Sequence, residues 1–238
     1  MTSIATFARS PEAIFAALIA KAANIGRLYE PDLVFIGGLA AYLHATNHSL
    51  TAAYAEATAD AAFYISLSAL SDLREIEELS QNSRLTKHAF QKAGFSFDVY
   101  AERQSSLPVP YDQVAAFAVE YDGVRVASLE HLLVLKLGAA VDRHASEHGR
   151  KDAKDALRIL LLASTSEFDT ERAVAFMQDE HIERLGIIVK GPEFLALAGG
   201  NAKVAKELRV RCQDVFARLK DAHDALTQSD AQPKPPKG

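Results

Sequence analysis

The sequence predicts an α/β half built on a mixed sheet, followed by an all-helical half, with the division near residue 127. Before that point, short runs rich in branched and aromatic residues alternate with glycine turns and helical stretches. From Ser128 onward the pattern is helical almost without interruption. The chain has 238 residues and is 49% hydrophobic, which is enough for a substantial core. We therefore expect an α/β domain over 1–127, a helical domain over 128–227 and a disordered tail over 228–238.

The first predicted elements are a helix, a strand and a second helix. Helical periodicity begins at Ser10, where Ser-Pro-Glu supplies a cap, a proline in the first turn and an early carboxylate, and it ends near Leu28. The run 33–36 then predicts a strand. This strand stops at Gly37-Gly38 and passes into a helix over 39–44, so the order is strand, glycine turn, helix.

Two further strands are expected downstream. The first covers 61–67, and a capping serine at 68 or 71 then begins a charged stretch. This stretch predicts a helix as far as Lys92, either continuous or broken near Asn82. Gly94 is expected to end this helix. The next strand covers 95–101.

A hairpin is predicted at the end of the α/β half. The runs 115–121 and 124–127 are strand-like and flank Asp122-Gly123, a dipeptide typical of tight hairpin turns. The helices expected after this hairpin cover 128–144, 150–163, 169–179, 181–190, 192–199 and 201–226.

Composition excludes several classes of protein. A single cysteine, Cys212, rules out an intrachain disulfide and every multi-cysteine zinc pattern, and it fits a reducing cytoplasm. The sequence has no signal-like start and no apolar run of roughly 18 residues that could span a bilayer, so we expect a cytoplasmic protein without a membrane partner.

Charge limits the ways in which nucleic acid could bind. A net charge of −5 argues against a basic surface over the whole molecule, so a nucleic-acid partner would have to use a local patch. The segment 201–220 has six basic residues against two acidic ones and offers such a patch. A solvated helix face is the simpler explanation of the same charges.

Glycines and carboxylates at strand ends suggest a site for phosphate and metal. At Gly37-Gly38, the missing side chains allow backbone N–H groups to approach phosphate oxygens at a helix N-terminus. Asp60 begins one predicted strand and Asp98 lies inside another. Carboxylates that project from neighbouring strands into one cleft are suitable ligands for Mg²⁺. Each of these features also occurs as an ordinary turn or strand-end residue.

Charged residues inside apolar helices add to this site. Lys136 lies in the otherwise apolar run 132–137, where a lysine must either reach outward or meet an anion such as a triphosphate. Asp152 and Asp155 are three residues apart on one helical face, and Lys151 is four residues from Asp155. A salt-bridged first helical turn is the simpler explanation of this second group.

In order along the chain, these motifs resemble the minimal nucleotidyltransferase domain. The segments are Phe-Ile-Gly-Gly-Leu-Ala at 35–40, Thr-Ala-Asp-Ala-Ala-Phe at 58–63 and Phe-Asp-Val at 97–99. The downstream stretch 126–155, with Lys136, Arg143 and Lys-Asp-x-x-Asp, is similar to the AbiEii and MenT-like toxins of toxin–antitoxin and phage-defence systems. The resemblance covers about residues 28–163.

The resemblance implies a cofactor, a substrate and a set of site residues. It implies Mg²⁺ held by Asp60 and Asp98, and a nucleoside triphosphate as substrate. The positions that would bind the nucleotide are Gly37, Gly38, Thr58, Lys136 and Lys151. The positions that would carry catalysis are Asp60, Ala62 (where an Asp is expected), Asp98, Lys136, Asp152 and Asp155.

Two positions depart from the family pattern. The family has a second carboxylate two residues after Asp60, but this chain has Ala62 there. The family also often has an arginine two residues before the threonine, and this chain has Glu56 at that position. Losing one of two metal-holding carboxylates is expected to cost several kcal/mol of transition-state stabilisation. Ala62 fits either an engineered inactivation of a toxic enzyme or a naturally degenerate homologue.

Three functions remain open from the sequence. The first is a toxin that transfers a nucleotidyl group from a nucleoside triphosphate to tRNA or to a protein hydroxyl, and that an antitoxin protein neutralises. The second is a catalytically silent relative that still binds nucleotide or a partner, which Ala62 favours. The third is a metal-independent ribonuclease of the HEPN kind, because Arg143, His144 and His148 match the spacing of that motif.

Overall fold

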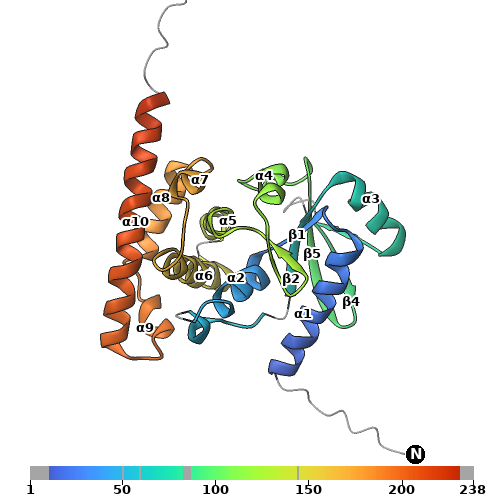
Figure 1. The fold of residues 1–238 in the computed structure, drawn as a ribbon, viewed down its shortest axis with the longest axis horizontal. Coiled ribbons are helices and arrows are strands. Elements are labelled where there is room, and N and C mark those ends of the chain that lie inside the picture. Colours follow the sequence, from blue (N-terminus) through green and yellow to red (C-terminus); the bar gives the residue numbers. More distant parts are fainter. Residues whose placement is uncertain (1–10, 50, 59, 83–86, 144, 231–238) are drawn as a thin grey trace, which may run out of the picture.

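A seven-stranded mixed sheet forms one side of the molecule and a set of helices forms the other (Figure 1). The computed structural model describes residues 11–49, 51–58, 60–82, 87–143 and 145–230. The strand order is β3-β4-β5-β2-β1-β7-β6, and β2 is the central strand. The strands are β1 Leu33–Ile36, β2 Asp60–Ile65, β3 Ser80–Asn82, β4 Lys87–Lys92, β5 Phe95–Ala101, β6 Val119–Tyr121 and β7 Val124–Val126.

The sheet contains both parallel and antiparallel pairs. β2 is parallel to β5 and antiparallel to β1, while β1 is parallel to β7. The outer pairs β3–β4, β4–β5 and β6–β7 are antiparallel. Parallel neighbours need crossover connections, and helices supply them here: α3 follows β2, and α2 follows β1.

The helices divide into those that lie between the strands or before them in the sequence, and those that come after the last strand. The first group is α1 Pro11–Leu28, α2 Gly37–Thr46, α3 Leu67–Ile76 and α4 Tyr111–Ala116, together with a short 3₁₀ helix at Ala52–Tyr54. The second group is α5 Leu129–Asp142, α6 Glu147–Ala163, α7 Thr170–Val174, α8 Asp179–Ile188, α9 Glu193–Leu197 and α10 Ala202–Asp230. Within the described ranges, no helix is both long enough and apolar enough to cross a bilayer.

An apolar face of the sheet forms the core under α1. Phe35, Phe63, Phe90 and Phe97 come from four strands, and each ring in this series contacts the next one. All four side chains are buried. α1 covers this face, and the ring of Phe35 lies beside Gly26 of that helix. Because side chains alternate along a strand, the residues between these phenylalanines point to the opposite face.

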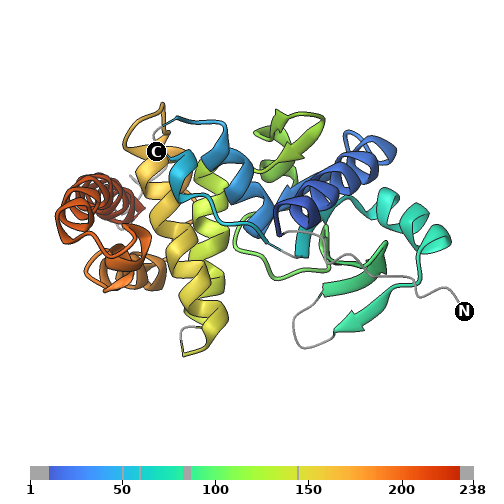
Figure 2. The same cartoon turned by 90° about the horizontal axis from the view of Figure 1, so that it is seen from below.

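The helical half lies against that opposite face. α5 and α6 pack against each other and also contact α2, and α10 packs along α6, α7, α8 and α9. Figures 1 and 2 both show α10 at the outer edge of the molecule, with α5 and α6 between it and the strands. The predicted α/β class with a mixed sheet and a helical C-terminal half is therefore confirmed.

The predicted helix that reaches Lys92 is wrong. Helix α3 ends at Ile76, and the chain then forms β3 and β4. His88 and Phe90 are buried and their neighbours are not, so β4 has the alternation of a strand, which its lysines and glutamine conceal in the sequence. Gly94 does not end a helix but forms a tight turn between β4 and β5 with Ala93, both at positive φ.

Smaller corrections concern element ends. Ser66, and not Ser68 or Ser71, caps α3. Most of the strand predicted over 115–121 is wrong, because α4 occupies Tyr111–Ala116 and only the last three residues pair in β6. The hairpin turn at Asp122-Gly123 is confirmed, with both residues at positive φ.

The predicted chain ends fall partly outside the described residues. Helix α10 continues to Asp230, so residues 228–230 are helical and the tail predicted to begin at 228 is wrong for these three positions. The remainder of that tail, 231–238, and the predicted cap Ser10 lie outside the described residues.

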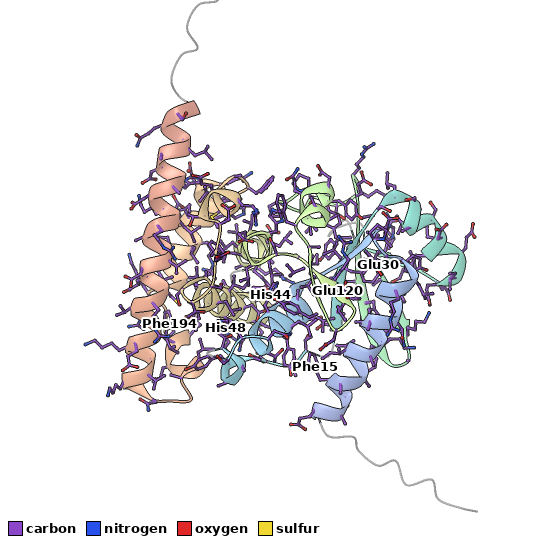
Figure 3. All side chains as sticks on the ribbon, in the orientation of Figure 1. Phe15, Glu30, His44, His48, Glu120 and Phe194 are labelled. Carbon is purple, nitrogen blue, oxygen red and sulfur yellow. The ribbon has the colours of Figure 1, made fainter. Side chains whose placement is uncertain are left out.

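Buried histidines predict a pH-dependent stability. Burial lowers the pKa of His44, His131 and His181. His44 lies near the centre of the molecule (Figure 3), where its ring contacts the carbonyl oxygen of Ala127 at 2.8 Å. Because the unfolded chain takes up protons on these histidines more readily, the free energy of unfolding should fall from about pH 7.5 to about pH 5.

His131→Leu should make this fall shallower, since the fully buried ring packs edge-on to Phe117 and Phe176. Urea unfolding at several pH values measures the slope, and His148→Leu, at an exposed position, is the control. Equal slopes in the two variants would contradict the assignment to His131.

Candidate functional site

The pairing of β2 with β5 brings the predicted carboxylates to one face of the sheet. Ala62 lies directly opposite Asp98, and Asp60 lies opposite Ser96, two residues earlier on both strands. Since the strands are parallel and in register, these side chains share a face. The alternate residues, including Phe63, face the apolar core under α1. Asp60, Ala62 and Asp98 therefore point towards the helical half.

The start of α2 forms the second wall of the site. Gly37 and Gly38 follow β1 directly, and Gly37 has a φ of 78°, which favours glycine. A Cβ atom on Gly37 would lie 3.5 Å from the Cβ atom of Ala62, so the turn runs close beside β2. The residue before the helix, Ile36, provides no side-chain cap. The N–H groups of the first turn are thus available to an anion at this wall.

Helices α5 and α6 form the third wall and enclose a cleft of about 130 Å³. Lys136 and Arg143 come from α5 and its end, and His148, Lys151 and Asp152 come from α6. The complete lining is Ile36, Gly37, Gly38, Asp60, Ala62, Asp98, Tyr100, Leu107, Leu135, Lys136, Ala139, Arg143, His148, Lys151 and Asp152. The structure thus brings together most of the residues singled out in the sequence.

Thr58 and Lys151 hold the carboxylate of Asp60. The Thr58 hydroxyl donates a hydrogen bond to Asp60, and the Lys151 ammonium donates to the same hydroxyl at 3.2 Å. Lys151 also lies 4.0 Å from the Asp60 carboxylate. Burial alone would raise the pKa of Asp60, but the Thr58 hydrogen bond and the Lys151 charge outweigh it and hold the pKa below its usual value.

Lys136 is buried within a network of charges between α5 and α6. Its ammonium contacts Asp155 at 2.5 Å and Asp152 at 3.3 Å. Burial alone would lower the pKa of Lys136, but the charges of Asp155 and Asp152 raise it, so the side chain stays protonated. Asp152 also accepts from Arg143 at 2.7 Å. Lys136 therefore reaches the cleft and does not point into open solvent.

Asp155 lies behind Lys136 and does not line the cleft. Its second oxygen accepts from Arg158 at 2.8 Å, and Arg158 in turn contacts Glu56 at 2.5 Å. Glu56 stands where the family resemblance leads one to expect arginine, and here it anchors the segment before β2 to α6. The placement of Asp155 makes it a positioning residue for Lys136.

Sequence reasoning missed two polar residues of the site. Lys87, at the start of β4, contacts the Asp98 carboxylate at 2.5 Å. Tyr100 lines the cleft one alternation beyond Asp98, and burial together with the Asp98 charge raises its pKa to about 12. Recognising β4 as a strand beside β5 would have revealed Lys87. Lys87 and Tyr100 also line an adjoining chamber of about 300 Å³.

The carboxylates fit one Mg²⁺ ion only in part. Within the described residues, no group of three or more His, Cys, Asp or Glu side chains is arranged to hold a metal ion. Ala62 offers no oxygen, and Asp152 is held by Lys136 and Arg143. Mg²⁺ often takes one or two carboxylates and completes its shell with water and substrate phosphates. Asp60 and Asp98 are the carboxylates that would take this role, and Asp98 is paired with Lys87 in this structure.

Comparisons with known proteins give fold likenesses only. No protein-family profile matches the chain, and no curated protein sequence matches it. A crystal structure of JHP933 from Helicobacter pylori is similar over 93% of this chain and 99% of its own, at 14% identity and a TM-score of 0.47. An antigenic nucleotidyltransferase-like protein from Paracoccidioides brasiliensis is similar over 79% of this chain and 92% of its own, at 14% identity and a TM-score of 0.49.

The ribonuclease-like motif and the basic segment 201–220 can also be located in the structure. Arg143 and His148 of the ribonuclease-like motif line the cleft, whereas His144 lies outside the described residues. The basic residues of segment 201–220 belong to α10, at the outer edge of the molecule and on the far side of α6 from the strands (Figure 2). These charges therefore do not face the cleft.

The Lys136 network should contribute strongly to stability. Lys136→Met leaves the buried carboxylates of Asp152 and Asp155 with one cation fewer, and we expect a loss of about 3 kcal/mol in the free energy of unfolding. Lys220→Met removes an exposed ion pair with Asp224, which water and salt screen, and should lower the free energy of unfolding far less than Lys136→Met. Chemical denaturation of both variants makes the comparison. A loss in Lys136→Met no larger than in Lys220→Met would show that the network is not structural.

Proposed function

We propose that the cleft binds a nucleoside triphosphate and that the protein is a nucleotidyltransferase whose transfer step is limited by Ala62. One observation carries the proposal: the glycine turn at the start of α2 lies against the strand face that bears Asp60 and Asp98. Lys151 and Lys136 approach the same cleft from α6 and α5. Backbone N–H groups, carboxylates and lysines in one cleft are the groups that phosphoryl-type transfer needs.

Each part of the cleft has a task in this proposal. The N–H groups of Gly37 and Gly38 bind phosphate oxygens, and Lys151 and Lys136 neutralise part of their charge. When bound, Mg²⁺ would supply charge neutralisation and alignment of the triphosphate, held by Asp60 and Asp98. In the transfer, an acceptor oxygen bonds to the α-phosphorus, the bond to the β-phosphate breaks, and pyrophosphate leaves. The acceptor proton passes to a base in the cleft or to water.

Ala62 is the weak point of this site. It lies directly opposite Asp98, at a spacing where two carboxylates could share metal ions. The Cβ atom of Ala62 faces the glycine turn, so an aspartate at this position would point at the phosphate-binding wall. An interaction made mainly in the transition state affects rate more than ground-state binding. Nucleotide binding should therefore survive in this chain better than transfer.

The resemblance of the motifs extends the proposal to a biological role. We propose a cytoplasmic toxin of a toxin–antitoxin or phage-defence system, with tRNA or a protein hydroxyl as acceptor and an antitoxin protein as partner. The segments at 35–40, 58–63 and 97–99 support this extension.

A catalytically silent binding protein is the second candidate. Ala62 favours it, because the described residues of β2 and β5 bring two carboxylates to the cleft, and one of them is already paired with Lys87. The ribonuclease alternative has a separate test, since RNA cleavage in EDTA that disappears in His148→Ala would support it.

Restoring the carboxylate tests the enzymatic proposal. Ala62→Asp should raise transfer of labelled nucleotide to total tRNA or to lysate protein by about 100-fold or more, because several kcal/mol of transition-state stabilisation return. The affinity for the triphosphate, measured by calorimetry, should change less. Expression of the variant should inhibit growth.

Ser96→Asp is the matched control for this gain. It adds the same charge to the same face of the sheet, opposite Asp60 and not opposite Asp98, and should give no gain in transfer. Absent transfer in the parent chain and in Ala62→Asp, with nucleotide still bound, would leave the binding protein as the function. Absent binding in both would refute the proposed site.

A further inference from the structure

Every carboxylate that lines the cleft is already paired with a protein cation. Asp60 lies beside Lys151, and Asp152 is held by Lys136 and Arg143. Asp98, the residue opposite Ala62, contacts the ammonium of Lys87. The partner cations differ in origin, because Lys151, Lys136 and Arg143 belong to the helical wall of the cleft. Lys87 comes from the sheet itself.

Lys87 is placed to hold Asp98 firmly. It begins β4, the strand beside β5, and Ala89 of β4 lies opposite Asp98, so Lys87 reaches Asp98 along the diagonal of an antiparallel pair. The Nζ–Oδ2 distance is 2.5 Å, and the side chains of Lys87 and Asp98 are only 16% and 26% exposed. A charge-assisted contact at this depth is stronger than an exposed surface pair. The ammonium thus occupies one of the positions from which a cation can bind Asp98.

We propose that Lys87 is a built-in competitor of the metal ion: its ammonium takes the place of a divalent cation at Asp98, and metal enters the cleft only when Lys87 releases this carboxylate. The inference rests on the proposed function, because that function makes Asp98 a metal ligand. It adds a residue to which neither the sequence motifs nor the resemblance assigned a role. Lys87 does not itself touch a reacting atom, so it is a regulator of the metal site.

The competition couples metal binding to triphosphate binding. Lys87 also lines the chamber that adjoins the cleft, and its long side chain can turn from Asp98 towards a new anion. A triphosphate in the cleft provides such an anion and at the same time supplies oxygens to the metal. Metal alone should therefore bind weakly, and inorganic triphosphate should tighten it. By linkage, the metal should tighten triphosphate binding by the same factor.

The test measures binding of Mn²⁺ alone to the full chain, by the loss of the free-ion electron paramagnetic resonance signal. Lys87→Met should bind Mn²⁺ roughly ten-fold more tightly than the parent chain, the gain expected when one charge-assisted contact no longer has to be broken. Lys92→Met is the matched control: it removes a lysine from the same strand, together with its ion pair to Glu77, and should leave Mn²⁺ binding unchanged. Thermal melts check that every variant is folded.

Two further variants locate the effect. Lys87→Arg retains a cation beside Asp98 and should bind Mn²⁺ like the parent chain. Adding Asp98→Asn to Lys87→Met should abolish the gain, because the released carboxylate is then missing. Inorganic triphosphate should tighten Mn²⁺ binding less in Lys87→Met than in the parent chain.

The proposal is overturned if Lys87→Met binds Mn²⁺ no more tightly than Lys92→Met, or if Lys87→Arg shows the same gain as Lys87→Met. These outcomes do not depend on nucleotide or on transfer. The proposed function fails separately, if the parent chain and Ala62→Asp both bind no nucleoside triphosphate in the presence of Mg²⁺. A ten-fold gain in Lys87→Met without nucleotide binding in any variant would support the metal competition and refute the proposed function.

Discussion

The buried ion network around Lys136 is the constraint on which the cleft depends. Lys136 of α5 contacts Asp152 and Asp155 of α6, so these ion pairs join the two helices that line the cleft. Arg158 extends the network to Glu56, in the segment that leads into β2 and carries Thr58. An ammonium buried this deeply is tolerated only because two carboxylates surround it. The same contacts that stabilise the helix pair therefore also set the distance between the helical half and the strand that bears Asp60.

The sequence predicted those parts of the fold in which apolar periodicity is strong. The core strands β1, β2 and β5 and the helices after Ser128 have it. Their ends lie within a few residues of the prediction, except that the helix predicted over 169–179 ends at Val174. β4 was missed because Lys87, Gln91 and Lys92 hide an alternation that depends on His88 and Phe90 alone. A strand at this distance from the centre of the sheet is decided by its pairing with β5, which is not visible locally. With β4 missing, no pattern could place Lys87 beside Asp98.

The charged motifs were easier to find than to interpret. Asp152 and Asp155 share a helical face as their spacing indicates, yet only Asp152 lines the cleft, because Asp155 is turned towards Arg158. Glu56 departs from the family pattern, and its contact with Arg158 gives it a structural role that replaces the expected arginine. Spacing along one helix specifies which residues share a face, but only the neighbouring helix decides which of them reaches the ligand. The resemblance indicated which motifs belong together, whereas the packing of the helices determines which of their residues line the cleft.

The balance of charges in the cleft relates Ala62 and Lys87 to the proposed metal site. The lining of the cleft includes three carboxylates, Asp60, Asp98 and Asp152, and three cations, Lys136, Arg143 and Lys151. If the cleft binds a triphosphate as proposed, this balance leaves little positive charge for it, and an added cation would have to offset its repulsion by the carboxylates. An aspartate at position 62 would make the cleft more negative and so raise its affinity for a divalent ion. With alanine there, the Lys87 ammonium already neutralises Asp98, so under our proposal an added cation has to displace Lys87 before it can bind this carboxylate.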